Sequence, residues 1–562
     1  MKGKRRITQV RYVAVPAFLL LCFAFTFDPP SSPFEVRRVQ GDGFPGSSLA
    51  DAWGERPVQA LVGAIRSVTA AVGNASFSEL DAETWRIDNP CAARAELGPR
   101  YARRPNAQEL DPYPEWELVL KEYSALHRTC MRSVGNVTEY FLSGATTSNC
   151  KFLIMEIEGV GLGNKIALLI SGMLYAILTQ RVVLLNTNSL IPSTICEPFL
   201  GSSWLLDEQF PLPGNNGWEN TMLGSWAGWE SPIWKSSKYF ERGVDSTKAG
   251  KDLAFSSAVK IEFSDPEVKR FFCDTEQAFL TEPTWLHFSG CLYFLPKLFA
   301  VPAFRPALEA LFPDPSLTLT YLLRSLMFPK DNVWEQVKQH DKDLFADVDR
   351  RVGIQVRFLY GRKVYFRGAS KRANDHVKQC VAENNILPSI VSLNPELQSS
   401  EAQSGQVIRV LVTSLHTALT EELLRMYENH RTATGDTVKV TQLTQRGKQG
   451  FSADEDIMAM VEILLLSFVD ELLVTPLSTF GGLAQAYGGI RPWFVDVKND
   501  DHSCVRAQSV DLCYQASSSR YECPHDPDVD SKEIQSLVPH MRICLPIEEN
   551  YGVQLVSPNQ VP

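Results

Sequence analysis

Short apolar runs alternate with helix-length runs along most of this chain, and that alternation constrains the fold more than any other feature. Lys151 to Glu158 has the pattern of a strand, a glycine loop then opens an apolar helix from Ile166 to Thr179, and Val182 to Asn186 has the pattern of a second strand. A strand, a helix and a strand in succession form the unit from which parallel sheets are built. The sequence therefore predicts an α/β fold.

The second half of the chain repeats the pattern. Predicted strands cover Arg350 to Tyr360, Val407 to Ser414, Glu471 to Thr475 and Trp493 to Val497, with helices at Thr420 to Asn429 and Ile457 to Phe468. We expect two α/β units, one before and one after about residue 335. A cleft between two such units is the default place for a ligand.

Arg357 stands at the end of the strand in which Val352, Ile354 and Val356 alternate. Ligands of α/β proteins gather at the carboxyl ends of the strands, and an arginine there presents a planar fork suited to phosphate. A surface arginine paired with an acid fits this stretch equally well. The strand by itself does not decide between the two interpretations.

The composition is that of a folded protein with two or three domains, at 562 residues, 44% hydrophobic and 21% charged. The net charge is −10, and the first eleven residues carry only basic charges, so the rest of the chain is more acidic still. An acidic body argues against nucleic acid as a partner.

The basic start runs into the uncharged apolar stretch 12–27. A cleaved signal peptide is one interpretation, but no small-residue cleavage site follows. We therefore expect an uncleaved signal anchor, with flanking residues extending it towards the roughly 20 residues that a bilayer needs. The amino terminus would be cytoplasmic and the body lumenal. Residues 28–85, rich in Pro, Gly, Ser and Ala, are predicted to be a mostly flexible stem, in which the stretch from Trp53 to Val72 suits a short helix.

The cysteines agree with a lumenal body. Of twelve cysteines, Cys22 lies in the predicted anchor, which leaves an odd number and no zinc-type pair. Several disulfides and one unpaired thiol are expected. Asn74 and Asn136 begin glycosylation acceptor sequences.

Three further patterns have two interpretations each. The loop from Gly159 to Lys165, with Gly161, Gly163 and Asn164 within it, precedes a helix and would form an anion site, or it serves only to bring the helix close to the strand. Ile166 breaks the dinucleotide fingerprint. The four tryptophans between residues 218 and 234 suit sugar stacking or ordinary packing. The Asp-x-Asp strings at 341–343, 347–349, 454–456 and 526–530 follow no apolar strand, so solvated acidic surface is expected and no metal site.

Taken together, several stretches resemble the plant cell-wall fucosyltransferases typified by xyloglucan fucosyltransferase. They run in the family's order from about residue 85 to the end of the chain. The stretches are Gly161-Leu162-Gly163-Asn164, Cys196-Glu197-Pro198-Phe199, Ser203-Trp204-Leu205-Leu206, Gly353-Ile354-Gln355-Val356-Arg357, Val412-Thr413-Ser414-Leu415, Glu462, Leu473-Val474-Thr475, Ser478-Thr479-Phe480-Gly481, Gly488-Gly489-Ile490-Arg491-Pro492-Trp493 and Val538-Pro539-His540-Met541-Arg542.

The resemblance implies a two-domain fold of the GT-B kind and inverting transfer of fucose from GDP-fucose to a galactose hydroxyl in α-1,2 linkage. The donor-site residues it implies are Arg357, Ser478, Thr479, Phe480 and Glu462, although Phe480 equally suits a role as pocket wall. GDP-fucose would be a substrate, and no metal or other cofactor is expected, because an arginine and neutral donors can stabilise the departing diphosphate.

The resemblance also gives each part of the chain a role. A cytoplasmic tail (1–11), the anchor (12–27) and the stem (28–85) would precede an acceptor-side domain (86–335), a GDP-fucose-binding domain (336–500) and a disulfide-rich terminal segment (501–562). The expected location is the Golgi membrane. The expected partners are a galactose-terminated polysaccharide or proteoglycan and either a second copy or other glycosyltransferases.

Three departures from the family pattern affect the acceptor side. Lys165 stands where the family has arginine, which keeps the charge but loses the fork. Cys291 occupies a place that is often polar or acidic in relatives and is our candidate for the odd thiol. Glu548, in a terminal loop two residues longer than the family's, is the candidate proton acceptor. Xyloglucan is the first expected acceptor. The alternatives are the same chemistry on arabinogalactan-type glycans and a non-catalytic glycan-binding or assembly role.

Overall fold

The computed structural model describes residues 56–560. The exceptions are 74–77, 103–112, 144–147, 158–159, 187–188, 211–257, 263–270, 282, 358–368, 392–404, 445–446, 448–449, 496–502, 524–528 and 545–550. Among the residues described, no helix is both long enough and apolar enough to cross a bilayer. The predicted tail, anchor and four-tryptophan stretch lie outside them.

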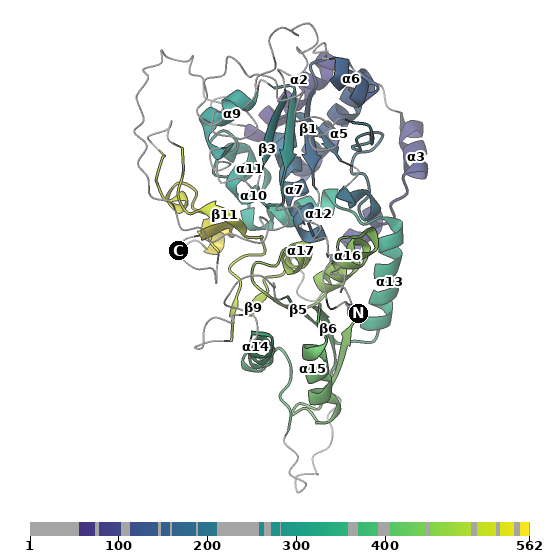
Figure 1. Cartoon of the computed structure of the whole chain (residues 1–562), viewed down its shortest axis with the longest axis vertical. Coiled ribbons are helices and arrows are strands. Elements are labelled where there is room, and N and C mark those ends of the chain that lie inside the picture. Colours follow the sequence, from purple (N-terminus) through teal and green to yellow (C-terminus); the bar gives the residue numbers. More distant parts are fainter. Residues whose placement is uncertain are drawn as a thin grey trace, which may run out of the picture.

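The first sheet is fully parallel, with the order β2-β1-β4-β3. Its strands are β1 (Lys151–Glu156), β2 (Arg181–Leu185), β3 (Ala258–Glu262) and β4 (Trp285–Ser289). The helix between β1 and β2 is α7 (Leu162–Leu178), as the sequence predicts. The helices of this half of the chain are α2 (Pro57–Val72), α3 (Glu79–Asp88), α4 (Ala93–Ala102), α5 (Pro114–Val134), α6 (Val137–Ser143), α9 (Asp274–Leu280), α10 (Leu295–Leu298), α11 (Arg305–Leu311), α12 (Thr318–Leu326) and α13 (Asp331–Phe345), with 3-10 turns η3 (Ile191–Ser193) and η8 (Pro315–Leu317). Figure 1 shows most of them around the first sheet, while α13 lies lower, beside the second half of the molecule.

The predicted stem is shorter than 28–85, because α2 belongs to the folded body. Val58, Leu61, Val62 and Ile65 recur at helical spacing and are all buried in the main core. The helix lies against α5 and α11. The sequence predicts a short helix in this region, but its place in the body depends on contacts with distant helices, which local sequence does not reveal.

The second sheet has the order β10-β9-β8-β5-β6-β7 and is parallel except for β10. Its strands are β5 (Arg350–Val356), β6 (Val407–Ser414), β7 (Thr437–Gln442), β8 (Glu471–Val474), β9 (Trp493–Val495) and β10 (Cys504–Arg506). The sheet therefore extends beyond the predicted boundary at residue 500. Its helices are α14 (Ala369–Glu383), α15 (Ala418–Glu428), α16 (Ala453–Ser467) and α17 (Thr479–Gly488).

The two faces of the second sheet have different surroundings. Val352, Ile354 and Val356 form a small core with residues of α14 and α15. On the opposite face, a side chain at Gly353 would lie 2.8 Å from Leu466 of α16. Figure 1 shows α16 and α17 between the two sheets, and α17 packs against α7 of the first.

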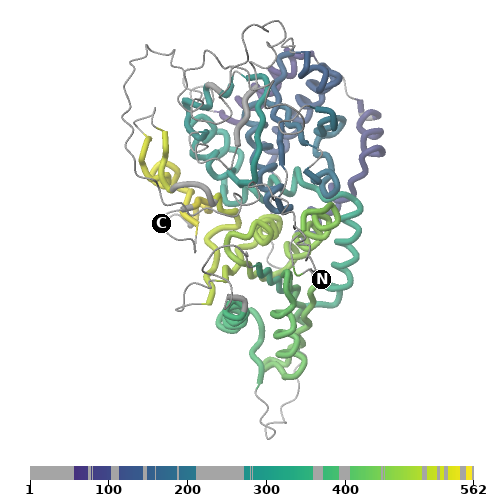
Figure 2. Tube along the Cα trace, in the orientation of Figure 1, coloured from purple at the N-terminus to yellow at the C-terminus, as the bar shows by residue number. Residues whose placement is uncertain are grey.

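The chain ends in a third sheet, which is antiparallel and has the order β11-β13-β12. The elements of this segment are β11 (Tyr514–Ser518), α18 (Ile534–Leu537), β12 (Met541–Ile543), β13 (Tyr551–Leu555) and the 3-10 turn η9 (Pro558–Gln560). In Figure 2 this yellow segment returns to the side of the first sheet.

Disulfides hold the segments together. They join Cys91 to Cys196, Cys130 to Cys150, Cys273 to Cys523, Cys380 to Cys504, and Cys513 to Cys544. The described part of the chain has no free cysteine, and Cys291 is disulfide-bonded too. The assignment of the odd thiol to Cys291 is therefore wrong: the odd count depended on setting Cys22 aside, and that residue lies outside the described part.

Candidate active site

Arg357 follows directly on β5. It lies where the carboxyl ends of the parallel strands β5, β6 and β8 of the second sheet line up, and this row of strand ends is the edge at which the site is built. Its backbone N–H donates to Oγ1 of Thr475, the residue after β8, over 3.0 Å. Burial lowers the pKa of Arg357 from its ordinary value, although arginine stays protonated near neutral pH. An arginine at the carboxyl ends of parallel strands can form charge-assisted hydrogen bonds with an anionic group, so this position suits a negatively charged ligand.

Helix α17 begins at the same edge. Leu477 has a left-handed φ of 64°, Ser478 caps the helix and Thr479 is its first residue. A leucine in the left-handed region is strained, and such strain is concentrated at functional loops. The turn presents the N–H groups at the start of a ten-residue helix to the edge where Arg357 lies. The amino terminus of a helix attracts phosphate.

The glycine loop meets this helix start from the first sheet. Thr479 Oγ1 donates to Asn164 Oδ1 over 2.6 Å. A Cβ atom at Gly163 would lie 2.7 Å from Thr479 Oγ1 and 3.0 Å from the Phe480 nitrogen, so only glycine permits this approach. The amino termini of α7 and α17 thus converge, and residues predicted from separate motifs form one site.

Lys165 contributes to this junction through an ion pair. Its Nζ lies 2.6 Å from Asp456 Oδ2, and both side chains are buried. Asp456 is in the first turn of α16, so the pair joins the two halves of the chain at the base of the glycine loop. The lysine therefore acts in the structure rather than as an open ligand-binding cation.

The ion pair also corrects the expectation for two of the acidic strings. Asp456 is 2% exposed rather than solvated, and Asp341 is buried beside Arg100, with which it forms an ion pair. In both cases an arginine or lysine from a distant segment provides the partner, which local sequence does not reveal. Over the described ranges, no group of three or more His, Cys, Asp or Glu side chains could hold a metal.

Glu462 lies on α16 and is buried. Its Oε1 accepts a hydrogen bond from Thr444 Oγ1, after β7, over 2.7 Å. The carboxylate therefore fixes the loop that follows the edge strand.

Buried polar atoms without hydrogen-bond partners also lie at the carboxyl ends of these strands. Among the described residues, Gln355 Oε1, Thr413 Oγ1 and Ser478 Oγ are buried and have no hydrogen-bond partner. Gln355 and Thr413 are paired residues on neighbouring strands β5 and β6, and Ser478 follows β8 on the other side of β5. Buried polar groups are almost always satisfied, so a group of exceptions at one edge indicates a ligand or ordered water there. The sequence did not single out Gln355 or Thr413, because what distinguishes them is the lack of a hydrogen-bond partner, which only the structure shows.

Three predicted residues remain to be placed. Glu548 and Asn74 lie outside the described residues. Asn136 is exposed, and its Oδ1 accepts a hydrogen bond from the Glu139 N–H at the start of α6, over 3.0 Å. An exposed asparagine at a helix start is accessible for modification.

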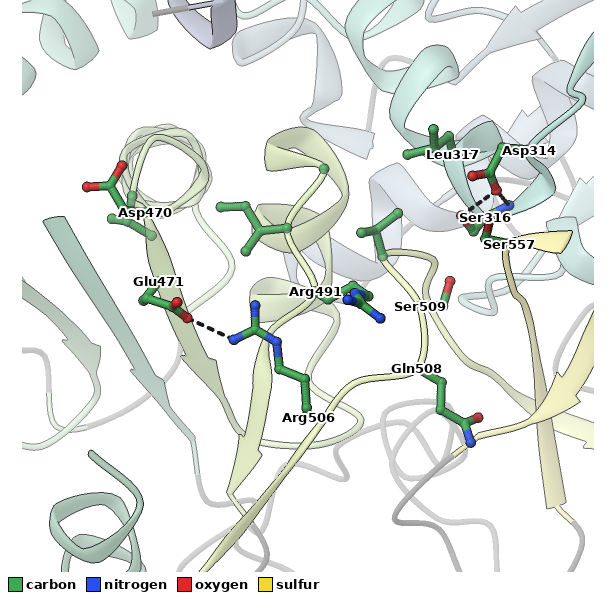
Figure 3. A pocket seen from close by; sticks show the side chains of 14 residues that line it. Asp314, Ser316, Leu317, Asp470, Glu471, Arg491, Arg506, Gln508, Ser509 and Ser557 are labelled. Carbon is green, nitrogen blue, oxygen red and sulfur yellow. Dashed lines mark hydrogen bonds and ion pairs between the residues drawn. The ribbon is translucent and has the colours of Figure 1, made fainter. Parts of the chain in front are cut away.

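A cavity of about 350 Å³ lies elsewhere, at the opposite end of α17 (Figure 3). Its charged side chains are largely engaged: Arg506 pairs with Glu471 over 2.8 Å, and Asp314 accepts hydrogen bonds from Ser316. It faces the amino ends of the strands, where α/β folds seldom bind ligands. We therefore place the functional site at the other edge, despite the size of this cavity.

The fold and the site define a class. Two parallel sheets, a cation at a strand end and two converging helix starts are the features of an α/β protein that binds a phosphorylated ligand between its halves.

Comparison with known proteins gives the family. Residues 91–524 match the family model for xyloglucan fucosyltransferase, and the chain belongs to that family; it is a glycosyltransferase. A galactoside 2-alpha-L-fucosyltransferase of Pisum sativum is 32% identical, over 78% of this chain and 75% of that protein. One of Arabidopsis thaliana is 30% identical, over 78% and 76%.

A solved structure is also similar. It is that of an Arabidopsis thaliana FUT1 mutant in complex with GDP, with a TM-score of 0.65 and 27% sequence identity. The match covers 87% of this chain and all of that one.

Proposed function

We propose that this protein transfers fucose from GDP-fucose to a galactose hydroxyl, with inversion and in α-1,2 linkage. The observation that carries the proposal is the convergence of Arg357 and the amino termini of α7 and α17 at one strand edge. The relatives named galactoside 2-alpha-L-fucosyltransferase support the sugar and the linkage. The similar structure that contains GDP supports the nucleotide.

The chemistry asks the protein to stabilise a departing diphosphate. Arg357 would contact its oxygens through a charge-assisted pair of hydrogen bonds, while Ser478, Thr479 and the first N–H groups of α17 donate from the other side. These groups are fixed before the ligand arrives, so little reorganisation opposes the reaction. The transfer would need no metal and no further cofactor.

The acceptor hydroxyl must lose a proton during the transfer. Glu548 remains our candidate for accepting it, either directly or through water. Phe480, half-buried beside the junction, would form part of the pocket wall, and Glu462 would act indirectly by holding the loop at Thr444.

We further propose xyloglucan as the acceptor, a GT-B arrangement of the two α/β units, and a single-pass Golgi anchor at 12–27. Arabinogalactan-type glycans are the alternative acceptor, and a non-catalytic glycan-binding or assembly role is the alternative function. The buried, preorganised donor edge favours catalysis.

The test is transfer of labelled fucose from GDP-fucose by the purified full-length protein, with xyloglucan and arabinogalactan offered side by side. Transfer to xyloglucan that persists in EDTA is the expected result. Transfer to arabinogalactan alone would replace the acceptor, and GDP binding without transfer to either glycan would favour the non-catalytic alternative. Fluorescence of a carboxyl-terminal fusion should coincide with a Golgi marker, and a diffuse signal would refute the anchor.

A further inference from the structure

A second, smaller cavity opens at the amino terminus of α17. It measures about 30 Å³ and is lined by Ser478 and Thr479 on one side and by the terminal segment, including Asp511, Leu512 and Gln554, on the other. One water molecule needs about 10–15 Å³. The cavity therefore accommodates one small polar group or two waters, next to the proposed diphosphate position.

Gln554 reaches this cavity because of its place in β13. Val553 and Leu555 on either side of it are buried in the main core. Side chains alternate along a strand, so Gln554 points to the opposite face of the third sheet, where its paired residue is Arg542. On this face it is still only 3% exposed, because the cavity and α17 cover it.

Two polar atoms that line this cavity have no hydrogen-bond partner among the described residues. They are Gln554 Nε2 and, across the same cavity, Ser478 Oγ, and both are buried. Burying a donor without a partner destabilises the folded state. Two such groups in one cavity indicate that something outside the chain satisfies them.

The surroundings define what that group must be. The carboxylate of Asp511 is occupied, since Oδ1 accepts from the Tyr293 hydroxyl over 2.5 Å and Oδ2 accepts from the Leu555 N–H over 2.9 Å. What remains in the cavity is an amide donor, a hydroxyl and the positive end of a helix. These groups suit an oxygen that accepts hydrogen bonds.

The terminal segment holds Gln554 in a fixed position. Cys513 and Cys544, which both line the cavity, form a disulfide, and the Ser509 hydroxyl donates to the Leu555 carbonyl. The segment after the second sheet is therefore a wall of the site.

We propose that Gln554 is a donor-binding residue, and that its amide, together with the Ser478 hydroxyl, binds an oxygen of the nucleotide sugar. The oxygen belongs either to the diphosphate or to the fucosyl ring. The inference rests on the proposed function and extends the site to a strand that no family motif quoted above includes.

Isothermal titration of the full-length protein tests this, with inorganic diphosphate, GDP and GDP-fucose as ligands. Gln554→Leu should bind GDP-fucose about tenfold more weakly, the effect of one lost hydrogen bond to a charged group. Gln554→Glu keeps the shape of the side chain but adds a negative charge, so it should weaken GDP-fucose binding more than Gln554→Leu does. Weaker binding of all three ligands assigns the contact to the diphosphate, and weaker binding of GDP-fucose alone assigns it to the sugar.

Gln277→Leu is the matched control. Gln277 is equally buried, but its Oε1 accepts from Tyr175 over 3.0 Å and its Nε2 donates to the Phe271 carbonyl. Gln277→Leu removes both hydrogen bonds and should lower the melting temperature without affecting ligand affinity. Gln554→Leu removes a donor that has no partner among the described residues, so it should leave the melting temperature unchanged or raise it. Unchanged affinity of both Gln554 variants for all three ligands would mean that only water fills the cavity and would overturn the inference. If the wild type binds none of the ligands, the proposed function fails and this inference fails with it.

Discussion

At the scale of single residues, the partners of a charged side chain decide its role more than the charge does. The sequence suits Lys165 to either acceptor binding or a structural role, and the structure buries it against Asp456. Arg506, in no predicted site, pairs with Glu471 and lies over the Trp493 ring at 5.0 Å. Arg357 differs from both, because it lies at the strand edge that carries unsatisfied polar atoms and two helix starts. Sequence supplied the position of each cation but not its neighbours.

Asp511 should make stability depend on pH. Burial raises the pKa of Asp511 to about 7, although hydrogen bonds from Tyr293 and Leu555 oppose the shift. In the unfolded chain an aspartate titrates near 3.9, so the folded state binds the extra proton between these values. The contribution of this carboxyl to the free energy of unfolding is fully present below about pH 4 and is lost as the pH rises through 7.

Urea unfolding of the wild type and Asp511→Asn across pH 4 to 8 measures this effect. The wild type should lose stability relative to the variant as the pH rises, by on the order of 4 kcal/mol at most. A difference between the two proteins that stays constant with pH would show that Asp511 keeps one protonation state.

At the scale of elements, the sequence predicted those with strong local periodicity. The strands β1, β2, β5, β6 and β8 and the helices α7, α15 and α16 lie within a few residues of the predicted ranges. It missed β7, whose side chains alternate between exposed and half-buried at the sheet edge, and the third sheet, whose short strands depend on disulfides and distant contacts. The strand-end arginine and the helix start after β8 were foreseeable; the contact between α7 and α17 was not, because it joins residues 315 positions apart.

The contact between the two helix starts predicts a sharp effect of Gly163→Ala. The added methyl would clash with Thr479 and the Phe480 backbone, which cannot move without shifting α17. Donor affinity should fall at least tenfold, because the diphosphate-binding N–H groups move. Gly63→Ala in α2 is the control: nothing lies within 4 Å, so the variant should be about 0.5–1 kcal/mol more stable and bind normally. Normal GDP binding by Gly163→Ala would contradict the proposed junction.

Helix α2 provides a second test at this scale. Leu61 is fully buried, so Leu61→Ala should cost about 2–5 kcal/mol of stability. Arg66→Ala on the exposed face, which removes only a surface ion pair with Glu122, should have a much smaller effect. Chemical denaturation compares the two, and an equally small effect at both positions would restore the interpretation of this region as a stem.

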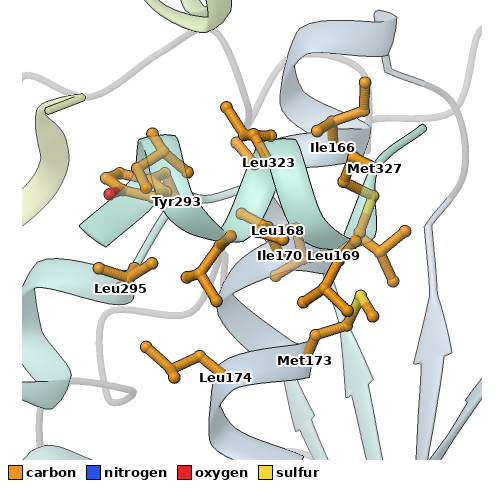
Figure 4. Packing of buried hydrophobic residues seen from close by; sticks show 14 of the residues in the cluster. Ile166, Leu168, Leu169, Ile170, Met173, Leu174, Tyr293, Leu295, Leu323 and Met327 are labelled. Carbon is orange, nitrogen blue, oxygen red and sulfur yellow. The ribbon is translucent and has the colours of Figure 1, made fainter. Parts of the chain in front are cut away.

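At the scale of the whole molecule, the two α/β units share one main core, while the outer face of the second sheet has a small core of its own with α14 and α15. Buried side chains of α7, α12 and α13 belong to the same cluster as those of α16, α17 and the terminal sheet. Figure 4 shows α7 side chains, including Leu168 and Ile170, meeting Leu323 of α12. The expectation of two units holds for the sheets, while the helices between them form a common interior.

A common core predicts one cooperative unfolding transition. Differential scanning calorimetry of the wild type should give a single peak whose calorimetric and van't Hoff enthalpies agree. Two resolved transitions, with only the later or the earlier one moved by GDP, would instead indicate halves that fold independently.

The most direct measurement is GDP affinity by isothermal titration for the wild type, Arg357→Ala and Arg506→Ala. Arg357 lies at the carboxyl ends of the parallel strands of the second sheet, at the proposed site. Arg506 lies at the amino ends of these strands, where it lines the larger cavity. We predict that Arg357→Ala weakens GDP binding by about 30-fold or more, equivalent to about 2 kcal/mol, and that Arg506→Ala binds as the wild type does. The reverse result would place the nucleotide in the large cavity and contradict the site proposed for this enzyme.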